Sequence, residues 1–225
     1  MARAAFFDLD KTILDTSSNV ALSGPFIEAG LMNRRTAIAS VLVQLPYLLS
    51  GADESRMEQM AEAMGRMGRG WNAAFLEATV EDALERTIEP VCYAQALRRI
   101  AYHKSVGDVV VIASASVEQV VRPIATMLGA DEVLASQAAI DEDGCFTGEM
   151  THFNQAQGKA DACAQLAHAR GWDLSQCSAY SDSVSDAPLL RLVGHPYAVN
   201  PDRALRDLAE REGWPTLTFM STVRV

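Results

Sequence analysis

The sequence predicts an α/β protein: a doubly wound parallel sheet with a small helical cap inserted after the first strand. Short apolar runs that suit buried strands recur along the chain, and helical patterns lie between most of them. This alternation is typical of a doubly wound sheet, because each helix carries the chain back to begin the next parallel strand. From about residue 20 to residue 89 the pattern is helical without a clear strand. We therefore expect a core of residues 1–14 and 90–225 and a cap of residues 15–89.

The predicted strands are short runs of β-branched, aromatic or other apolar residues. The first covers residues 4–7, and a β-branched run at residues 109–113 is typical of a central parallel strand. Further strands are expected at residues 132–135, 178–180, 197–199 and 217–219. The turn sequence at residues 141–144 predicts a β-hairpin that reaches about residue 150.

Helices are expected between these strands, and several carry recognisable end signals. Pro90 suits the first turn of a helix over residues 90–104. Gly129 and Gly171 are placed to end two further helices, and Asn200 is a candidate N-cap of the last one. The expected bounds of the other core helices are residues 117–128, 160–170 and 187–193.

Within the cap, the second of two helical runs covers residues 71–87, where apolar residues such as Phe75 recur with helical spacing. Three glycines fall within six residues before it: Gly65, Gly68 and Gly70. Because glycine weakens a helix, they predict a bend or a mobile loop at this point.

The composition is that of an ordinary globular protein and argues against several kinds of partner. Of 225 residues, 49% are hydrophobic and 21% charged, and the formal net charge of −10 disfavours binding to nucleic acid or to an anionic membrane. The apolar stretch at residues 37–49 is too short to span a bilayer, so we expect a helix packed inside the insertion. The first strand begins so near Met1 that we expect no signal peptide. Four cysteines without metal-ligand spacing indicate reduced thiols in a cytoplasmic protein: Cys92, Cys145, Cys163 and Cys177.

Acidic, hydroxyl and basic side chains follow the predicted strands or open a helix. Asp8 and Asp10 come directly after the first strand, Ser114 and Asp182 after two others, and Lys159 at the start of a helix. The carboxyl ends of parallel strands form one edge of a sheet, where ligands bind. Two carboxylates this close repel each other, and Mg²⁺ would compensate them, because it takes oxygen ligands and often binds one or two carboxylates plus substrate phosphate. The group predicts a site for a phosphate ester.

Each of these residues has a role in such a site. Asp8 would attack phosphorus, and Asp10 would protonate the leaving oxygen and later activate water. The Ser114 hydroxyl and the backbone N–H groups after it, beginning with that of Ala115, would hold phosphate oxygens. Lys159 would neutralise charge between the nucleophile and the phosphate.

The metal would have a small set of protein ligands. We expect Asp182 to bind Mg²⁺ directly, together with the carboxylate of Asp8 and the backbone carbonyl of Asp10. Asp186 would support this site or orient its waters.

The ordered set resembles the haloacid dehalogenase superfamily of phosphohydrolases. Residues 8–12 (Asp-Leu-Asp-Lys-Thr) look like its first motif, Ser114 its second, Lys159 its third and residues 181–186 its fourth. A small helical cap between the first two motifs resembles the phosphoserine-phosphatase-like branch (subfamily IB). The resemblance implies a Rossmann-like core, a mobile cap and a Mg²⁺-dependent mechanism through an aspartyl-phosphate.

One position departs from the phosphoserine phosphatases, which place a Glu after the first motif to receive the ammonium group of the substrate. Here Ser17 stands where that Glu is expected, so we predict weak activity on phosphoserine. Arg66 and Arg69 in the glycine-rich segment could bind a carboxylate or a second phosphate of the substrate. The alternative for both arginines is a solvated surface.

The sequence therefore predicts a cytoplasmic, Mg²⁺-dependent phosphomonoesterase that acts on a small phosphorylated metabolite, with neither nucleic acid nor a membrane as partner. Two alternatives remain: a phosphotransferase to an acceptor other than water, and an inactive protein that binds a phosphorylated ligand. A dehalogenase fits less well, because its reaction does not require the acid that Asp10 supplies. We expect the four histidines to be structural, with His152 nearest the third motif. The sequence leaves the oligomeric state open.

Overall fold

A computed structural model describes residues 3–33 and 54–223 of the chain. In this part of the chain seven strands form one sheet in the order β4-β3-β2-β1-β5-β6-β7. All neighbouring pairs are parallel except β3 and β4, which form an antiparallel hairpin. The strand bounds are β1 Ala4–Phe7, β2 Val109–Val117, β3 Glu132–Ile140, β4 Phe146–His152, β5 Ser178–Ser181, β6 His195–Val199 and β7 Thr216–Leu217.

The first strand lies at the centre of the sheet, between β2 and β5. All four of its residues are buried, as expected for a parallel strand covered on both faces. Its side chains alternate between two apolar clusters: Phe7 stacks on Tyr180 on one face, whereas Phe6 contacts Trp172 edge to face on the other. The carboxyl end of this strand is thereby fixed from both sides.

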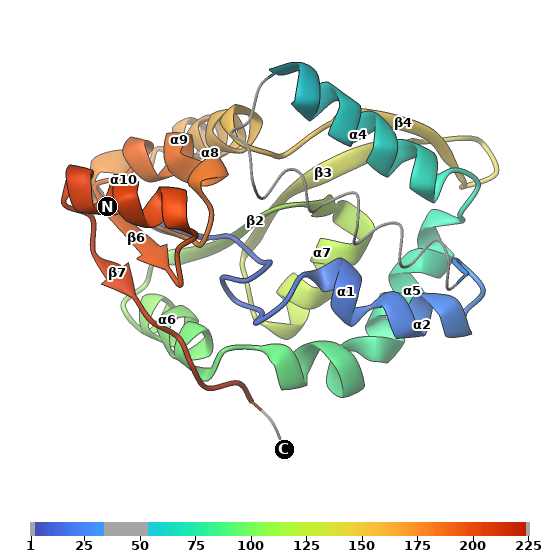
Figure 1. The fold of residues 1–225 in the computed structure, drawn as a ribbon, viewed down its shortest axis with the longest axis horizontal. Helices are drawn as coiled ribbons and strands as arrows, with labels where there is room; N and C mark the ends of the chain where they lie inside the picture. Colours follow the sequence, from blue (N-terminus) through green and yellow to red (C-terminus); the bar gives the residue numbers. More distant parts are fainter. Residues whose placement is uncertain (1–2, 34–53, 224–225) are drawn as a thin grey trace.

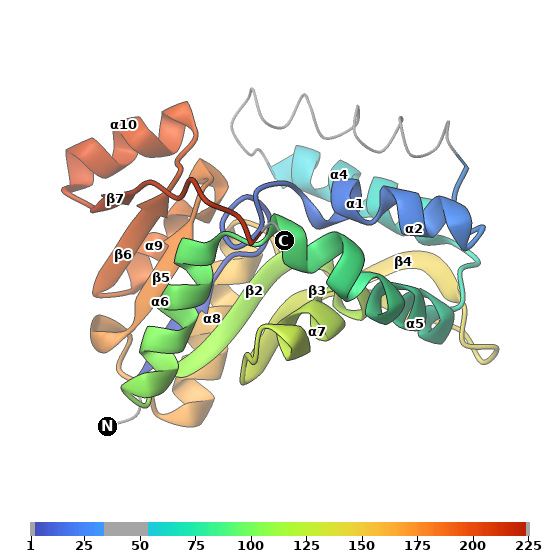
Figure 2. The ribbon, with the colours of Figure 1, turned by 90° about the horizontal axis from the view of Figure 1, so that it is seen from below.

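Helices cover both faces of the sheet, which confirms the predicted doubly wound fold. In Figure 2, α6 and α7 lie in front of the strands and α8 lies behind them. Residues of α8, α9 and α10 belong to one apolar cluster and residues of α6 and α7 to the other. The bounds of these helices are α6 Ala94–Ser105, α7 Glu118–Met127, α8 Gln157–Arg170, α9 Ala187–Leu192 and α10 Arg203–Glu212.

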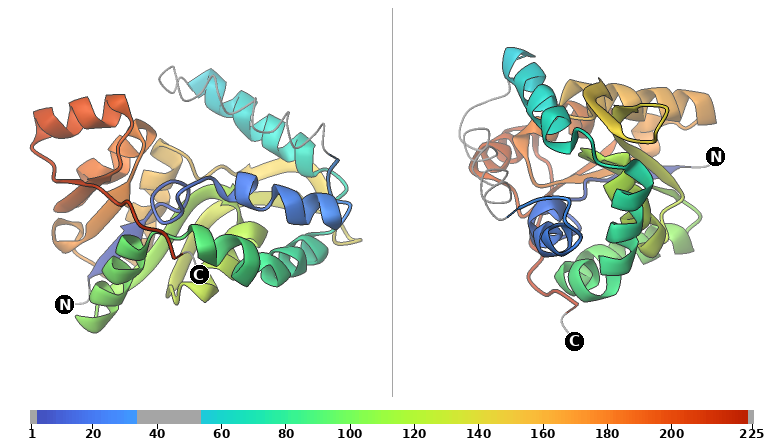
Figure 3. Two further views of the ribbon diagram at one scale, coloured as in Figure 1. Left: turned by 60° about the horizontal axis from the view of Figure 1, so that its bottom comes forward. Right: turned by 90° about the vertical axis from the view of Figure 1, so that its right-hand side faces the viewer.

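The segment between β1 and α6 is helical where the structure describes it, and we call residues 15–89 the cap. Figures 1 and 3 show its α4 near β4, far along the sheet from α10. The predicted helix at residues 37–49 lies outside the described residues. The cap helices are α1 Ser18–Ala21, α2 Ser23–Glu28, α4 Glu54–Gly68 and α5 Ala73–Ala83, and short π and 3-10 turns at Leu84–Ile88 and Glu89–Val91 lead to the core.

The predicted bend or mobile loop at the three glycines is wrong for most of its length, because α4 continues through Gly65 to Gly68. A Cβ atom at Gly65 would lie 2.2 Å from the carbonyl oxygen of Gly148, so glycine is needed for the close approach of α4 to β4. Only Gly70 has a positive φ, of 81°, among these three.

The chain after α4 is hydrogen-bonded to the β3–β4 hairpin. The N–H of Gly70 donates to the carbonyl of Phe146 at 2.8 Å, and the N–H of Phe146 donates to the carbonyl of Trp71 at 2.9 Å. The N–H of Ala73 donates to the carbonyl of Gly144 at 2.9 Å. The cap and this hairpin are therefore joined by backbone hydrogen bonds as well as by side-chain packing.

Two local predictions need correction. The N-cap of α10 is Asp202, whose carboxylate accepts from the N–H of Leu205 at 2.7 Å. Asn200 instead adopts a positive φ of 42°, and its side-chain amide bonds both the N–H and the carbonyl of Phe219. Phe75, which the helical spacing assigned to the apolar face of α5, is 50% exposed.

The cysteines carry no disulfide, and Cys92, Cys163 and Cys177 are buried. None of the helices in the described ranges is long and apolar enough to cross a membrane.

Candidate active site

Three neighbouring strands deliver the predicted functional residues to one edge of the sheet. Asp8 directly follows β1, and its backbone N–H donates to the carbonyl of Tyr180 in β5 at 3.0 Å. Ser114 lies in the last part of β2, and Asp182 directly follows β5. Because these strands are adjacent and parallel, residues more than 170 positions apart in the sequence, such as Asp8 and Asp182, share one site.

The ammonium group of Lys159 lies between two carboxylates. It donates to Oδ1 of Asp8 and to Oδ2 of Asp186, both at 2.8 Å, and the residue is 2% exposed. Burial alone would lower the pKa of Lys159, but the charges of Asp186 and Asp8 outweigh it and raise the pKa above its usual value. Lys159 therefore stays charged and holds one oxygen of Asp8 in a fixed direction.

The position of Lys159 depends on the tight turn before α8. A Cβ atom at Gly158 would lie 2.7 Å from the carbonyl oxygen of Phe153, a distance that side chains do not tolerate. Ala156, just before the helix, adopts a positive φ of 49°, which is uncommon for a residue with a side chain. The first turn of α8 is thus pressed against the preceding loop, and this places Lys159 beside Asp8.

Replacing Gly158 with alanine should displace the start of α8 and move the ammonium group of Lys159 away from Asp8. We expect a loss of about 1–3 kcal/mol in the free energy of unfolding from the steric conflict. We also expect kcat/KM to fall by roughly tenfold to a hundredfold, because small displacements of catalytic groups are costly. Urea unfolding and phosphate-release kinetics measure the two effects.

The control is Gly24→Ala in α2, where a new Cβ would meet nothing within 4 Å. Alanine is the better helix former, so this variant should be neutral or slightly more stable. A Gly158→Ala protein that matched Gly24→Ala in both measurements would contradict the steric argument.

Thr12 lies between the second oxygen of Asp8 and the carboxylate of Asp182. Its Oγ1 is 3.2 Å from Oδ2 of Asp8 and 3.3 Å from Oδ1 of Asp182. One hydroxyl proton cannot satisfy both acceptors at once, so the two carboxylates face each other with too few donors.

Negative charge at this edge exceeds the positive charge that the described side chains supply. Burial raises the pKa of Asp8 to about 7 even though Lys159 opposes the shift, and the charge of Asp186 adds to it. The pKa of Asp182 is raised well above its usual value by burial and by the nearby charges of Asp8 and Asp186. The Oδ1 atom of Asp186 is buried without a hydrogen-bond partner.

These observations fit a hard cation with oxygen ligands at this edge. A cation would compensate Asp8 and Asp182, and one of its waters could satisfy the orphaned oxygen of Asp186. Among the described residues, no group of three or more His, Cys, Asp and Glu side chains forms a metal site by itself. The expected set remains compatible with that finding, since it contains two carboxylates and a backbone carbonyl and Mg²⁺ commonly completes its shell with water and substrate.

Asp10 is oriented by the start of α1. Its Oδ1 accepts from the backbone N–H of Ser18 at 2.8 Å. Burial raises the pKa of Asp10, against the lowering effect of the hydrogen bonds from Ser18. A carboxyl group with a raised pKa keeps its proton at higher pH than a free one does, which suits a general acid.

The segment that contains Ser114 is held in place from two directions. Its Oγ accepts from the N–H of Ser116 at 3.1 Å, and Ser114 is 1% exposed. The side chain of Asn154 donates to the carbonyl of Ser114 at 2.9 Å, and Ser136 donates to the carbonyl of Ala115 at 2.7 Å. Asn154 thus supports the predicted phosphate-binding segment.

Asn154, Thr12 and the serine pair Ser18 and Ser116 contact the site residues without having been predicted from the sequence. Thr12 could have been found, because it stands two positions after Asp10 in the first motif. Asn154 carries no such signal, because its role follows from contacts with Ser114 across 40 positions of sequence.

The structure does not bring Arg66 and Arg69 to this site. Arg66 is exposed and forms an ion pair with Glu62 on the same helix at 3.0 Å. Arg69 is exposed and its side-chain carbons cover the backbone of Gly148. Both arginines therefore correspond to the solvated surface, the alternative left open by the sequence.

Ser17, His103 and His152 make local hydrogen bonds. Ser17 is the N-cap of α1, with its Oγ accepting from the N–H of Val20 at 3.3 Å. His103 is buried and hydrogen-bonded to Asp108 and Tyr180, each at 2.8 Å. His152 lies 3.5 Å from Oδ1 of Asn154.

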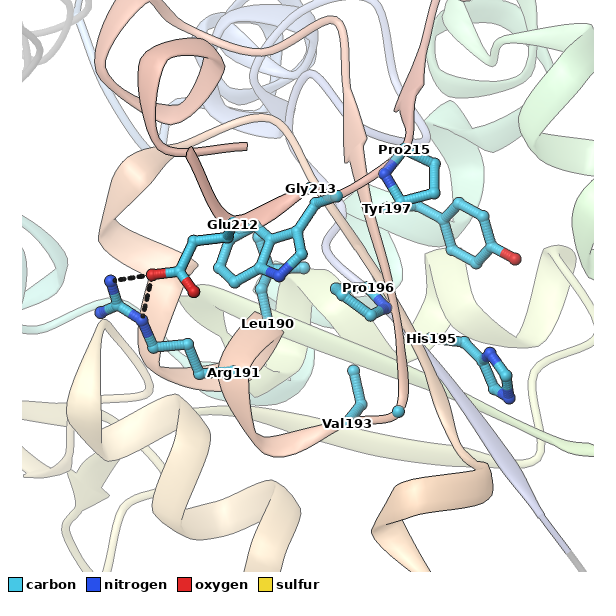
Figure 4. A pocket seen from close by; sticks show the side chains of 11 residues that line it. Leu190, Arg191, Val193, His195, Pro196, Tyr197, Glu212, Gly213 and Pro215 are labelled. Atoms are coloured by element: carbon cyan, nitrogen blue, oxygen red, sulfur yellow. Dashed lines mark hydrogen bonds and ion pairs between the residues drawn. The ribbon is translucent and has the colours of Figure 1, made fainter. Parts of the chain in front are cut away.

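Figure 4 shows a separate pocket, beside the start of β6 and the end of α10. Arg191 and Glu212 pair at its side at 2.9 Å, and the rings of Tyr197 and His195 lie on the other side of β6 from this pair. The amino end of β6 is the edge of the sheet opposite to the one that holds Asp8. This pocket is therefore not part of the candidate active site.

The fold and the arrangement of Asp8, Lys159 and Asp182 are typical of hydrolases with an α/β core and a helical insertion after the first strand. The model of the haloacid dehalogenase-like hydrolases matches residues 5–191, and the chain belongs to this family.

Relatives and a solved structure agree with this assignment. The chain is 45% identical over 222 residues to the "Inhibition of morphological differentiation protein" of Streptomyces azureus, covering 99% of this chain and 80% of that protein. It is 45% identical over 220 residues to "Probable phosphatase Rv3661" of Mycobacterium tuberculosis, covering 98% of this chain and 76% of that one. The structure of a phospho-aspartyl intermediate analogue of phosphoserine phosphatase superposes with a TM-score of 0.68 at 17% identity, over 99% of this chain and 96% of the other, which shows the shared fold.

Proposed function

We propose that this family member, a phosphatase, hydrolyses small phosphomonoesters through a phosphoaspartyl intermediate on Asp8. The observation that carries the proposal is the buried contact between Lys159 and Asp8, with Asp186 on the other side of the ammonium group. It gives Asp8 a fixed orientation and places a positive charge where an anionic phosphate must approach a carboxylate.

In the first step a carboxylate oxygen of Asp8 attacks phosphorus while the bond from phosphorus to the alcohol oxygen breaks. The carboxyl group of Asp10 donates its proton to that oxygen, so a neutral alcohol leaves. In the second step the Asp10 carboxylate takes a proton from water, whose oxygen attacks phosphorus, and the bond to Asp8 breaks to release phosphate. The Ser114 hydroxyl and the backbone N–H of Ala115 would hold phosphate oxygens in both steps.

The carboxylates of Asp8 and Asp182 and the backbone carbonyl of Asp10 would hold Mg²⁺, with Asp186 in support. When bound, the ion would screen the nucleophile from the negative charge of the phosphate. We assign this chemistry to a core of residues 1–14 and 90–225, with residues 15–89 as the cap over the leaving group, in the cytoplasm.

The metal assignment predicts that chelation abolishes phosphate release and that added Mg²⁺ restores it. In the variant Asp182→Asn, the Mg²⁺ concentration for half-maximal activity should rise by roughly tenfold to a hundredfold, because one charged ligand becomes neutral. Asp207→Asn is the matched control, since Asp207 is exposed on α10. Full activity of the wild-type protein in excess chelator would refute the metal assignment while leaving covalent catalysis by Asp8 to be tested separately.

A further inference from the structure

A cavity of about 50 Å³ lies between the cap and the core. Its walls come from α4 of the cap, from the segment around α1 and α2, from the end of β2 and the start of α7, and from the β3–β4 hairpin. The cavity is thus lined by segments that lie far apart in the sequence.

Two hydrogen bonds connect the wall of the cavity to Asp10. Ser116 forms part of its wall, and the Oγ atoms of Ser116 and Ser18 are 3.0 Å apart. The backbone N–H of Ser18 in turn donates to the carboxylate of Asp10 at 2.8 Å. Asp10 is the proposed acid that protonates the leaving oxygen, and the serine pair places the cavity on the Asp10 side of the site, where the group attached to that oxygen leaves.

The lining of the cavity is almost entirely apolar. Among the described residues, its polar groups are the side chains of Asn19 and Ser116 and the indole N–H of Trp71, and no charged residue lines it. The remaining wall includes Phe26, Met64, Met67 and Phe146. An ammonium or carboxylate group in this space would lose its hydration without gaining a charged partner from these walls.

We propose that this cavity receives the leaving group of the substrate and that the preferred substrates are phosphomonoesters of apolar alcohols, with a short alkyl chain or hydrophobic ring on the ester oxygen. The inference rests on the proposed function. A cavity of about 50 Å³ holds about three to five groups the size of a water molecule, since one such group needs about 10–15 Å³. The flexible side chains of Met64 and Met67 can make room for a somewhat longer chain.

The first test compares methyl, ethyl, propyl and butyl phosphate as substrates in excess Mg²⁺. These esters share the same dianionic phosphate and differ in apolar length. We expect kcat/KM to rise by about fourfold per methylene until the cavity is filled, the factor that corresponds to about 0.8 kcal/mol per buried methylene. The polar isostere 3-hydroxypropyl phosphate should fall below butyl phosphate by about tenfold or more, and phosphoserine should rank below both.

The second test changes the cavity wall. Met67→Gln keeps the length of the side chain but adds an amide, and it should lower the ratio of kcat/KM for butyl over methyl phosphate by about tenfold. Met220→Gln is the matched control, because Met220 is 80% exposed and does not line the cavity. The ratio of kcat/KM for butyl over methyl phosphate in this variant should equal that of the wild-type protein.

The outcomes separate this inference from the proposed function. If the protein hydrolyses the esters but kcat/KM is constant or falls with chain length, the apolar leaving-group site is refuted and the phosphatase mechanism stands. The inference also fails if the wild-type series rises and Met67→Gln leaves it unchanged. If no phosphomonoester is hydrolysed, the proposed function itself fails. The wild-type series decides the matter even if the variant does not fold.

Discussion

Replacing Asp8 with asparagine should reduce hydrolysis of every phosphomonoester to the background rate, a loss of about 10⁴-fold or more in kcat. The side chain keeps its shape, but an amide oxygen is too poor a nucleophile to form the phosphoaspartyl intermediate. Phosphate release at saturating Mg²⁺ measures the effect. Asp207→Asn makes the same chemical change on the exposed face of α10 and should retain wild-type turnover.

The Asp8→Asn protein should still fold, and without metal its stability should depend less on pH. The pKa of Asp8 is raised to about 7 by burial, whereas an unfolded Asp has a pKa of 3.8, so between these values the folded state binds the proton more tightly. The stabilisation that the protonated Asp8 carboxyl group gives to the folded state is therefore complete below about pH 4, and it is lost as the pH rises through 7. Thermal unfolding of metal-free protein from pH 5 to 8 should show a steeper fall in Tm for wild type than for Asp8→Asn.

Near-normal turnover of the Asp8→Asn variant would exclude covalent catalysis by Asp8.

Replacing Lys159 with methionine should abolish activity and destabilise the protein. Methionine fills similar space but leaves Asp8 and Asp186 buried without the ammonium group that lies 2.8 Å from each. Removing one partner of a buried ion pair costs about 3–5 kcal/mol. For a chain of 225 residues that corresponds to a fall in Tm of roughly 6–20 °C. The defect should diminish at lower pH, where the carboxyl groups take up protons.

Lys104→Met is the control for charge removal at the surface. Lys104 pairs with Asp131, and both side chains are 42% exposed, so solvent screens the interaction. We expect this variant to lose less than about 1 kcal/mol and to keep its activity. If Lys159→Met unfolded at the same temperature as Lys104→Met, the buried pairs would not contribute to stability in the way the geometry indicates.

The sequence was sufficient to predict the fold class and to suggest which residues would meet. Asp8 and Lys159 are separated by 151 positions, yet alternation of strands and helices predicts that both lie at the carboxyl edge of one sheet. The alternation of strands and helices and the parallel direction of the strands are enough to place both residues there, without knowledge of the side-chain positions.

Contacts that depend on packing could not be predicted in this way. The direction of Arg66 and Arg69 is set by how α4 lies on β4, and the glycine pattern that suggested a bend instead permits contact with Gly148. Asn200 looked like a helix cap, but its amide bonds the backbone of Phe219 in the last part of the chain. In each case a tertiary contact decided between conformations that the local sequence allows equally well.

The hydrogen bonds that join residues 70–73 to residues 144–146 bear on how this enzyme could be redesigned. Substitutions in α4 that enlarge the apolar cavity will also shift the β3–β4 hairpin, because the backbone at Gly65 is in close contact with that of Gly148. Mutagenesis libraries for new substrates should therefore randomise residues 64–73 and 144–150 together, as one block, rather than the cap by itself.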